Sequence, residues 1–270
     1  MRLRSAFALS GSDSYDPSPI SASSMSSTAF GAFAALLPSL AHHSAHLSLA
    51  DSLTADGHKW LNVPYDLGIF FTRSATALPR SFGPSPASAP PAYLTPSTST
   101  SGAAPPSHTI PGLEVPIPSP LNVGIENSRR FRALPLYASL LALGRDGYAQ
   151  IIRNNIALAT RIRTYLSTHP GYVLMNPNAD LNIVLFRGSD ALDPACAWHP
   201  TQVGAGGALA GALNGGRKVY VSPTAWEGKG AVRIAVGNWR AGEEEGREEE
   251  WEVVKGELDR VAEEGGLVRV

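Results

Sequence analysis

The chain has 270 residues, 43% of them hydrophobic, which is enough to bury one substantial core or two small ones. Its 22 basic and 23 acidic residues leave a net charge of −1, so no strong field directs it to nucleic acid or to an anionic membrane. The single cysteine excludes an internal disulfide and a multi-cysteine metal site, which favours a reducing, cytoplasmic setting. No apolar run of about 18 residues could span a bilayer, and the apolar stretch near Met1 is too short for a secretory signal.

The first 78 residues divide into two parts. Residues 1–27 are rich in Ser, Asp and Pro and have neither helical nor strand periodicity, which predicts a start without fixed structure. Residues 28–78 begin with an Ala-rich apolar stretch, which predicts a helix or helical turn ending near Pro38. Short apolar runs at Leu53 and at residues 69–71 then predict two buried strands joined by a polar turn.

The rest of the chain divides into a Pro-rich segment, helices and a small domain. Residues 79–120 hold 12 of the 22 prolines, so we expect a long flexible insertion there; a linker between domains is the alternative. Residues 121–170 should form bridging helices, because apolar residues recur there at intervals of three and four: Tyr148, Ile151, Ile152, Ala159, Ile162 and Leu166. Residues 171–270 predict a small α/β or α+β domain with strands at 173–175, 182–187, 218–221 and 231–236, then an amphipathic helix carrying Trp251, Val254, Leu258 and Val261.

The polar turn between the first two strands carries a candidate catalytic lysine, Lys59. A lysine that forms a Schiff base needs a site that disfavours its charge or places it beside a carbonyl cofactor. His58 directly precedes it, Asp56 and Gly57 add a carboxylate and a tight turn, and Trp60 returns the chain to apolar packing. Taken alone, Lys59 is more typical of a surface lysine after a polar turn.

Three blocks of sequence, in order, carry a family resemblance. The first is Ser52-Leu53, five residues, Lys59-Trp60, then Asn62-Val63-Pro64-Tyr65-Asp66 and Gly68. The second is residues 121–134, with Ser128-Arg129-Arg130-Phe131-Arg132 at its centre, and the third joins residues 218–224 to residues 232–240. Together they resemble the group II pyridoxal-phosphate-dependent amino acid decarboxylases, which include the aromatic amino acid, tyrosine, glutamate and diaminobutyrate decarboxylases.

The resemblance implies a fold class, a cofactor and a reaction. The fold would be α/β: part of a fold-type I pyridoxal-phosphate-dependent transferase-like large domain, followed by the small carboxy-terminal domain. Lys59 would form the Schiff base with pyridoxal 5′-phosphate, with His58 beside the ring or phosphate and Asp56 on the phosphate side. The substrate would be an L-amino acid, and the protein a homodimer. As alternatives, His58 fits a hydrogen-bonded turn histidine and Asp56 a turn-capping carboxylate.

The chain departs from the family's pattern at three places. Ser27 stands where the family has the aspartate that pairs with the cofactor's ring nitrogen, and no tyrosine lies between Tyr93 and Tyr137, where the mobile loop commonly has one; His108 is a poor substitute. Only 58 residues precede Lys59, too few for the family's phosphate cradle. A truncated, inactive homologue acting as a binding partner, or an incomplete gene model, is therefore the alternative function. Another fold-type I enzyme, such as an aminotransferase, lacks the second block.

Other polar clusters predict less. His42 and His46 are four residues apart, a spacing that zinc sites use, but no acidic or cysteine partner follows at a recognisable spacing, so we expect no metal site. Arg129, Arg130 and Arg132 open a helix and could hold a substrate carboxylate, a partner subunit or structural ion pairs.

Overall fold

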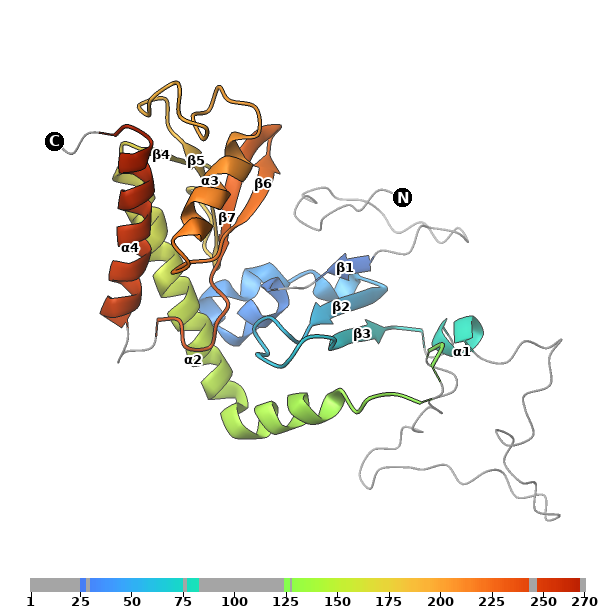
Figure 1. The fold of residues 1–270 in the computed structure, drawn as a ribbon. Helices are drawn as coiled ribbons and strands as arrows, with labels where there is room; N and C mark the ends of the chain where they lie inside the picture. The colour runs from blue at the N-terminus through green and yellow to red at the C-terminus, as the bar shows by residue number, and fades with distance from the viewer. Residues whose placement is uncertain are drawn as a thin grey trace, which may run out of the picture. The chain divides into compact units, whose positions relative to one another are not determined.

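The computed structural model describes residues 25–27, 30–74, 77–82, 124–126, 128–242 and 247–267 (Figure 1). By its internal contacts the chain divides into two compact units. The smaller comprises Met1–Ser27, Leu49–Thr54 and Phe70–Ala133, and the larger comprises Thr28–Ser48, Ala55–Ile69 and Leu134–Val270. The candidate lysine and the carboxy-terminal sheet therefore both belong to the larger unit.

An antiparallel sheet of four strands forms the centre of the larger unit. Its strands are β4 (Tyr172–Leu174), β5 (Ile183–Gly188), β6 (Ser222–Trp226) and β7 (Lys229–Ala235), in the order β4-β5-β7-β6. Glu227 and Gly228 join β6 to β7 with positive φ angles of 49° and 75°, as a two-residue hairpin requires. This hairpin sets the register, pairing Trp226 with Lys229.

One predicted strand was misplaced. Residues 218–221 were expected to be a strand, whereas β6 begins at Ser222. The physical reason is the Asn214 side chain, which accepts a hydrogen bond from the Val221 N–H at 2.8 Å and donates one to the Val221 carbonyl at 2.9 Å. These bonds satisfy the backbone of Val221 without a ladder partner.

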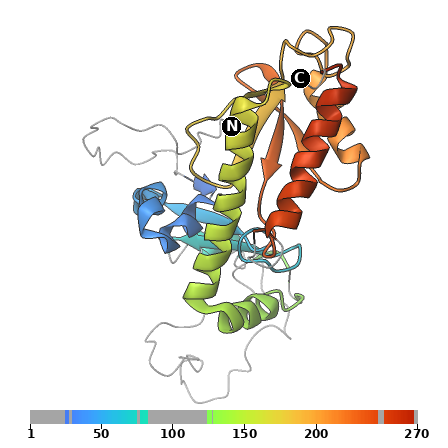
Figure 2. The same cartoon turned by 90° about the vertical axis from the view of Figure 1, so that its left-hand side faces the viewer.

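Three helices pack with this sheet: α2 (Ala133–Thr168), α3 (Ala205–Gly215) and α4 (Arg247–Glu264). Figure 2 shows α2 and α4 running side by side. The predicted apolar stripe of α2 is confirmed, because all six of its residues are buried. The predicted final helix is confirmed too, and its Trp251, Leu258 and Val261 enter the same core as Phe186 and Val232 of the sheet.

The first part of α2 differs from the second. Gly144 interrupts the helix with φ 57° and ψ −170°, a backbone conformation that glycine adopts readily. Before it, Tyr137 and Leu141 are 61% and 68% exposed, although the sequence there is as apolar as a buried helix. Helix formation was thus predicted correctly for this part, while several of its apolar side chains are exposed.

A second apolar cluster lies beneath the lysine turn. It joins Leu37, Trp60, Ala149 and Ile152, with Phe30 and neighbouring residues packed against it. The segment before the lysine forms three 3-10 helices, η1 (Gly31–Leu36), η2 (Pro38–Ser44) and η3 (Leu47–Leu49). The helical turn η1 ends at Leu36, near Pro38 as predicted, and Pro38 then starts η2, because a proline at the first helical position has no intrahelical hydrogen bond to lose.

A three-stranded sheet contains β1 (Met25–Ser27), β2 (Ser52–Asp56) and β3 (Gly68–Thr72), in that order. The strands β2 and β3 confirm the prediction for the flanks of the lysine turn. However, Phe70 and Phe71 are 47% and 58% exposed, so the expected burial of β3 was wrong. Strand β1 also corrects the expectation that residues 1–27 lack structure, since Met25 pairs in parallel with the distant Ser52.

The remaining described segment is the short helix α1 (Ala77–Phe82), at the start of the Pro-rich stretch. Residues 1–24 and 83–123, on which most of the predicted unstructured start and the predicted insertion fall, lie outside the described residues. Among the helices that the structure describes, none combines the length and the apolar character needed to cross a membrane.

Candidate functional site

The lysine turn runs from the end of β2 to the start of β3 and is closed by its own backbone. The Gly57 N–H donates to the Leu67 carbonyl at 2.9 Å, and the Val63 N–H donates to the Gly57 carbonyl at 3.2 Å. A Cβ at position 57 would lie 2.5 Å from Leu67 Cδ2 and 2.9 Å from Val63 Cγ2, so the turn closes this tightly only around glycine. Asn62 has a φ of 52°, a conformation that asparagine tolerates better than most residues.

The Lys59 side chain points to the carboxylate that ends β2. Its Nζ lies 2.5 Å from Asp56 Oδ2, and the two side chains are 28% and 38% exposed. The same amine lies 5.6 Å from the centre of the Phe30 ring. The Lys59 amine is therefore partly open to solvent and is held in place by the Asp56 carboxylate.

The His58 side chain stacks on the Tyr65 ring. The ring centroids are 4.1 Å apart and the planes are inclined by 15°. Tyr65 is 78% exposed, so this pair forms a flat aromatic surface at the outer edge of the turn. The described partner of His58 is therefore the Tyr65 ring, although Asp56 lies only two residues earlier in the sequence.

Trp60 anchors the turn to helix α2 through one buried amide. The Trp60 side chain is fully buried, and its indole N–H donates to Asn155 Oδ1 at 3.0 Å. Asn155, also fully buried, donates from Nδ2 to the carbonyl of Asn238 at 2.9 Å and to that of Ala241 at 3.2 Å. A single amide therefore connects the residue after Lys59 to the segment that follows β7.

Two hydroxyl groups hold the next residue of the turn. Tyr148 donates to the Leu61 carbonyl at 3.2 Å, and Ser139 Oγ lies 2.7 Å from the Tyr148 hydroxyl. Burial raises the pKa of Tyr148, and the hydrogen bond with Ser139 only partly opposes that shift. The phenol consequently stays protonated at neutral pH and keeps donating to the turn.

Sequence reasoning found the chemical groups of this site and missed most of its supports. The structure brings Lys59 and Asp56 into direct contact and leaves His58 on the adjacent Tyr65. Phe30, Asn155 and Tyr148 were not predicted. Asn155 could have been, because it lies four residues from both Ile151 and Ala159, on the apolar stripe of α2, where a polar side chain needs a buried partner.

The other predicted groups lie elsewhere or outside the described residues. Arg129 and Arg132 each lie 4.0 Å from Glu126 Oε2, which favours the ion-pair interpretation of the arginine cluster. The side chain of Ser27 and the residue His108 lie outside the described part of the chain.

Two surface hollows are described away from the lysine turn. The larger, about 620 Å³, is lined by α2 and α4 residues, among them Arg161 and Trp251, and the smaller is lined around His169 and Asp259. None of the three predicted site residues lines either hollow.

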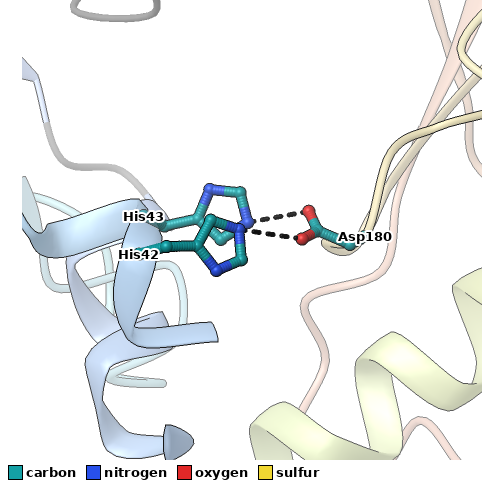
Figure 3. A group of neighbouring side chains, drawn as sticks. All are labelled: His42, His43 and Asp180. Atoms are coloured by element: carbon teal, nitrogen blue, oxygen red, sulfur yellow. Dashed lines mark hydrogen bonds and ion pairs between the residues drawn. The ribbon is translucent and has the colours of Figure 1, made fainter. Parts of the chain in front are cut away.

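A cluster of His42, His43 and Asp180 lies apart from the lysine turn, and its partner for His42 differs from the one that sequence spacing suggested. His42 Nε2 lies 3.2 Å from Asp180 Oδ2, and His43 Nε2 lies 2.7 Å from Asp180 Oδ1 (Figure 3). His46, the residue proposed as a possible partner of His42 by spacing, is exposed and is not a member of this group. The acidic partner that the sequence did not reveal is 137 residues away from His43.

Comparison with known proteins identifies the class to which this site belongs. Residues 27–189, more than half of the chain, match the pyridoxal-dependent decarboxylase conserved domain. The chain therefore belongs to the pyridoxal-dependent decarboxylase family, whose cofactor is pyridoxal phosphate. The matched residues contain Lys59, its supports on α2 and the His42–His43–Asp180 cluster.

Particular relatives agree with this assignment. The chain is 33% identical over 141 residues to an aromatic-L-amino-acid decarboxylase of Bacillus atrophaeus, which covers 51% of this chain and 25% of that protein. It is 26% identical over 227 residues to tryptophan decarboxylase 1 of Oryza sativa subsp. japonica, covering 84% of this chain and 40% of the relative. The chain thus spans between a quarter and two fifths of the length of these relatives.

A solved structure confirms the predicted fold class. The crystal structure of the Oryza sativa enzyme TDC with PLP and tryptamine superposes with a TM-score of 0.65 at 24% identity, covering 88% of this chain and 44% of that one. The arrangement of helices and sheets therefore corresponds to part of this α/β fold.

The described residues fit one end of pyridoxal phosphate. An accessible amine with a neighbouring carboxylate, Lys59 with Asp56, suits the aldehyde, and the flat face of Phe30 lies near that amine. For the ring nitrogen, the sequence resemblance predicts Ser27 at the position where the family has aspartate. A serine hydroxyl carries no charge to retain a proton there, so the fit is at the covalent end of the cofactor.

Proposed function

We propose that this protein decarboxylates an L-amino acid with pyridoxal phosphate held as a Schiff base on Lys59. The single observation that supports this most is the Lys59–Asp56 pair, 2.5 Å apart, inside a turn that carries the family's lysine motif. The names of the relatives make aromatic L-amino acids the first substrates to test.

Each described residue of the turn has a role in this proposal. Lys59 would supply the amine that holds the cofactor covalently. Asp56 orients the Lys59 amine through their ion pair, and the His58–Tyr65 stack covers the outer edge of the turn. When bound, the cofactor supplies the electron sink for the charge left on the α-carbon as carbon dioxide leaves.

Buried hydrogen bonds beneath the turn fix the position of the Lys59 backbone. Trp60 and Leu61 follow Lys59 directly, and their hydrogen bonds to Asn155 and Tyr148 fix the backbone on which the lysine lies. A small displacement of a reacting group can cost a large factor in rate, so these buried contacts matter to the chemistry as well as to stability.

A non-catalytic homologue is the second candidate function. The observation that favours it is the serine at position 27, because an uncharged hydroxyl leaves the cofactor ring a weaker electron sink. Such a protein would still attach pyridoxal phosphate at Lys59 while releasing no carbon dioxide.

The test has two arms that separate these candidates. Pyridoxal phosphate is added to the full chain, the visible absorbance is recorded, and the adduct is reduced with borohydride and located by peptide mass spectrometry. Lys59→Ala should abolish the adduct, whereas Lys229→Ala, on the exposed β6–β7 hairpin, should leave it unchanged. Carbon dioxide release from L-tryptophan, L-tyrosine and L-phenylalanine is measured in parallel.

The outcomes are distinct. An adduct at Lys59 with carbon dioxide release supports the decarboxylase, and an adduct without release favours the non-catalytic homologue. Adducts spread over several lysines, or an adduct that survives Lys59→Ala, would contradict both.

We also propose that the protein is a cytoplasmic homodimer. The exposed apolar residues on the first part of α2, such as Tyr137 and Leu141, support a second copy as their partner, and the single cysteine is consistent with a reducing compartment. Size-exclusion chromatography with light scattering tests the dimer, and a monomer at micromolar concentration would contradict it.

A further inference from the structure

Two imidazoles and one carboxylate converge on a single point outside the lysine turn. His42 Nε2 and His43 Nε2 face the two oxygens of Asp180, at 3.2 Å and 2.7 Å. Figure 3 shows both rings directed across to the carboxylate from the same side. The ring centroids are 4.1 Å apart and the planes are inclined by 37°, so the two imidazoles lie side by side without stacking flat.

The two sides of this cluster come from distant parts of one compact unit. Both histidines lie at the end of η2, and Asp180 lies in the loop between β4 and β5. Adjacent residues of a 3-10 helix differ by about 120° around its axis, so two neighbouring side chains do not normally share a target. Here the two side chains share a target, since both rings turn toward the carboxylate of Asp180.

The loop that carries Asp180 is held on both sides of that residue. Arg163 on α2 donates to the Leu181 carbonyl at 2.8 Å, and the buried Asn182 donates to the Val236 carbonyl at 2.7 Å. Leu181 itself packs against the apolar cluster that contains Leu37, the residue just before η2. The carboxylate is therefore placed in advance opposite the histidines, as a ligand site requires.

The ligand types and their spacing fit a divalent transition metal ion. Zn²⁺ accepts imidazole nitrogen and carboxylate oxygen at about 2.0–2.2 Å, and two ligands of a tetrahedral ion then lie roughly 3.4 Å apart. The three ligand atoms already lie within 4.8 Å of one another, so an ion needs only small side-chain movements. Mg²⁺ and Ca²⁺ prefer sites made wholly of oxygen ligands, which this cluster does not provide.

The exposure of the three side chains decides whether an ion can reach this site from solvent. The His42 side chain is 61% exposed and Asp180 is 43% exposed, whereas His43 is only 10% exposed. An ion can reach the site from solvent, bind the two outer ligands and be fixed by the inner one. Three protein ligands leave the fourth tetrahedral position to water.

We propose that His42, His43 and Asp180 form a binding site for one divalent transition metal ion of the Zn²⁺ type, which fastens η2 to the β4–β5 loop. The site is independent of the function proposed for Lys59. Metal bound there stabilises the folded chain, because the ligands come together only when it is folded.

The experiment uses the full chain, stripped with a chelator and without pyridoxal phosphate. Zn²⁺ binding is measured by titration calorimetry, and Co²⁺ is added separately because its visible absorption reports the number of ligands. We expect one Zn²⁺ per chain, a raised thermal unfolding temperature with Zn²⁺ and no such rise with Mg²⁺. Binding should strengthen as pH rises, since imidazole binds metal only when neutral.

The variants assign the binding to these residues. His42→Gln changes a largely exposed side chain and Asp180→Asn keeps the shape of the carboxylate, so both should fold while binding Zn²⁺ at least about tenfold more weakly. His46→Gln alters an exposed histidine of the same segment that is not in the cluster, and it should bind within about twofold of the unaltered chain.

The proposal is overturned if the unaltered chain takes up no Zn²⁺. It is equally overturned if either His42→Gln or Asp180→Asn leaves the affinity unchanged, because each supplies one of the three ligands. Loss of binding in His46→Gln to the same extent would place the metal elsewhere and refute the assignment as well.

Discussion

Replacing Asn155 by alanine should destabilise the protein more than any other single change to the supports of the lysine turn. Asn155 accepts one hydrogen bond from Trp60 and donates two, to the carbonyls of Asn238 and Ala241. Alanine removes all three bonds, and in the folded state it leaves a buried indole N–H and two carbonyl groups without that partner.

The magnitude follows from the burial of those groups. A buried polar group left without a partner costs about 1–3 kcal/mol, with the higher values for donors that have no other acceptor. The indole N–H belongs to a fully buried side chain, whereas the Asn238 carbonyl is only partly buried. We therefore expect the free energy of unfolding to fall by about 3–4 kcal/mol, a shift of roughly 1–2 M in the urea midpoint.

Urea unfolding followed by tryptophan fluorescence measures this change. Asn154→Ala is the matched control on the adjacent residue, because the described bond of the Asn154 side chain is to Gln150 alone, and it should cost less than about 1 kcal/mol. Trp60→Phe and the double variant complete a thermodynamic cycle, in which we expect a coupling of about 1–2 kcal/mol.

Two results would refute the reasoning. One is an Asn155→Ala variant no less stable than Asn154→Ala. The other is strict additivity of Trp60→Phe and Asn155→Ala, which would mean that the 3.0 Å bond between them contributes nothing to stability.

Two further predictions concern a glycine and a buried carboxylate. Gly57→Ala places a Cβ 2.5 Å from Leu67 Cδ2 and should lower the free energy of unfolding by about 1–3 kcal/mol in urea titrations, whereas Gly68→Ala, with nothing within 4 Å of its Cβ, should cost clearly less; equal costs would contradict the close packing of the turn. Arg260, 2.8 Å away, holds the pKa of Glu257 below its ordinary 4.5, so this carboxylate stabilises the protein above that pH and the contribution is lost as the pH falls through the lowered value. Glu257→Gln should accordingly lower the thermal unfolding temperature at pH 7. On acidification, the unfolding temperature of this variant should fall by less than that of the unaltered chain. An equal fall in both proteins would contradict this role for Glu257.

Much of the fold could be predicted because its signals are local. The buried stripe of α2 and the apolar face of α4 follow from spacings of three and four residues, and the strands beside the lysine follow from short apolar runs. The strand predicted at residues 218–221 is absent because the Asn214 side chain makes both backbone hydrogen bonds of Val221, and apolar spacing contains no signal for such a side-chain contact. Strand β1 was missed because its partner, β2, lies far along the chain.

The sequence by itself indicated the lysine turn: its residues Ser52-Leu53, Lys59-Trp60 and Asn62-Val63-Pro64-Tyr65-Asp66 resemble the family's lysine signature, and the tight closure around Gly57 follows from residues close in sequence. Only the tertiary structure decided what lies beneath and beside that turn. It placed Asn155 against Trp60, 95 residues away, and Asp180 against His43, 137 residues away. Such contacts depend on how helices and loops pack around a shared core, and short-range periodicity contains no information about which distant polar groups that packing brings together.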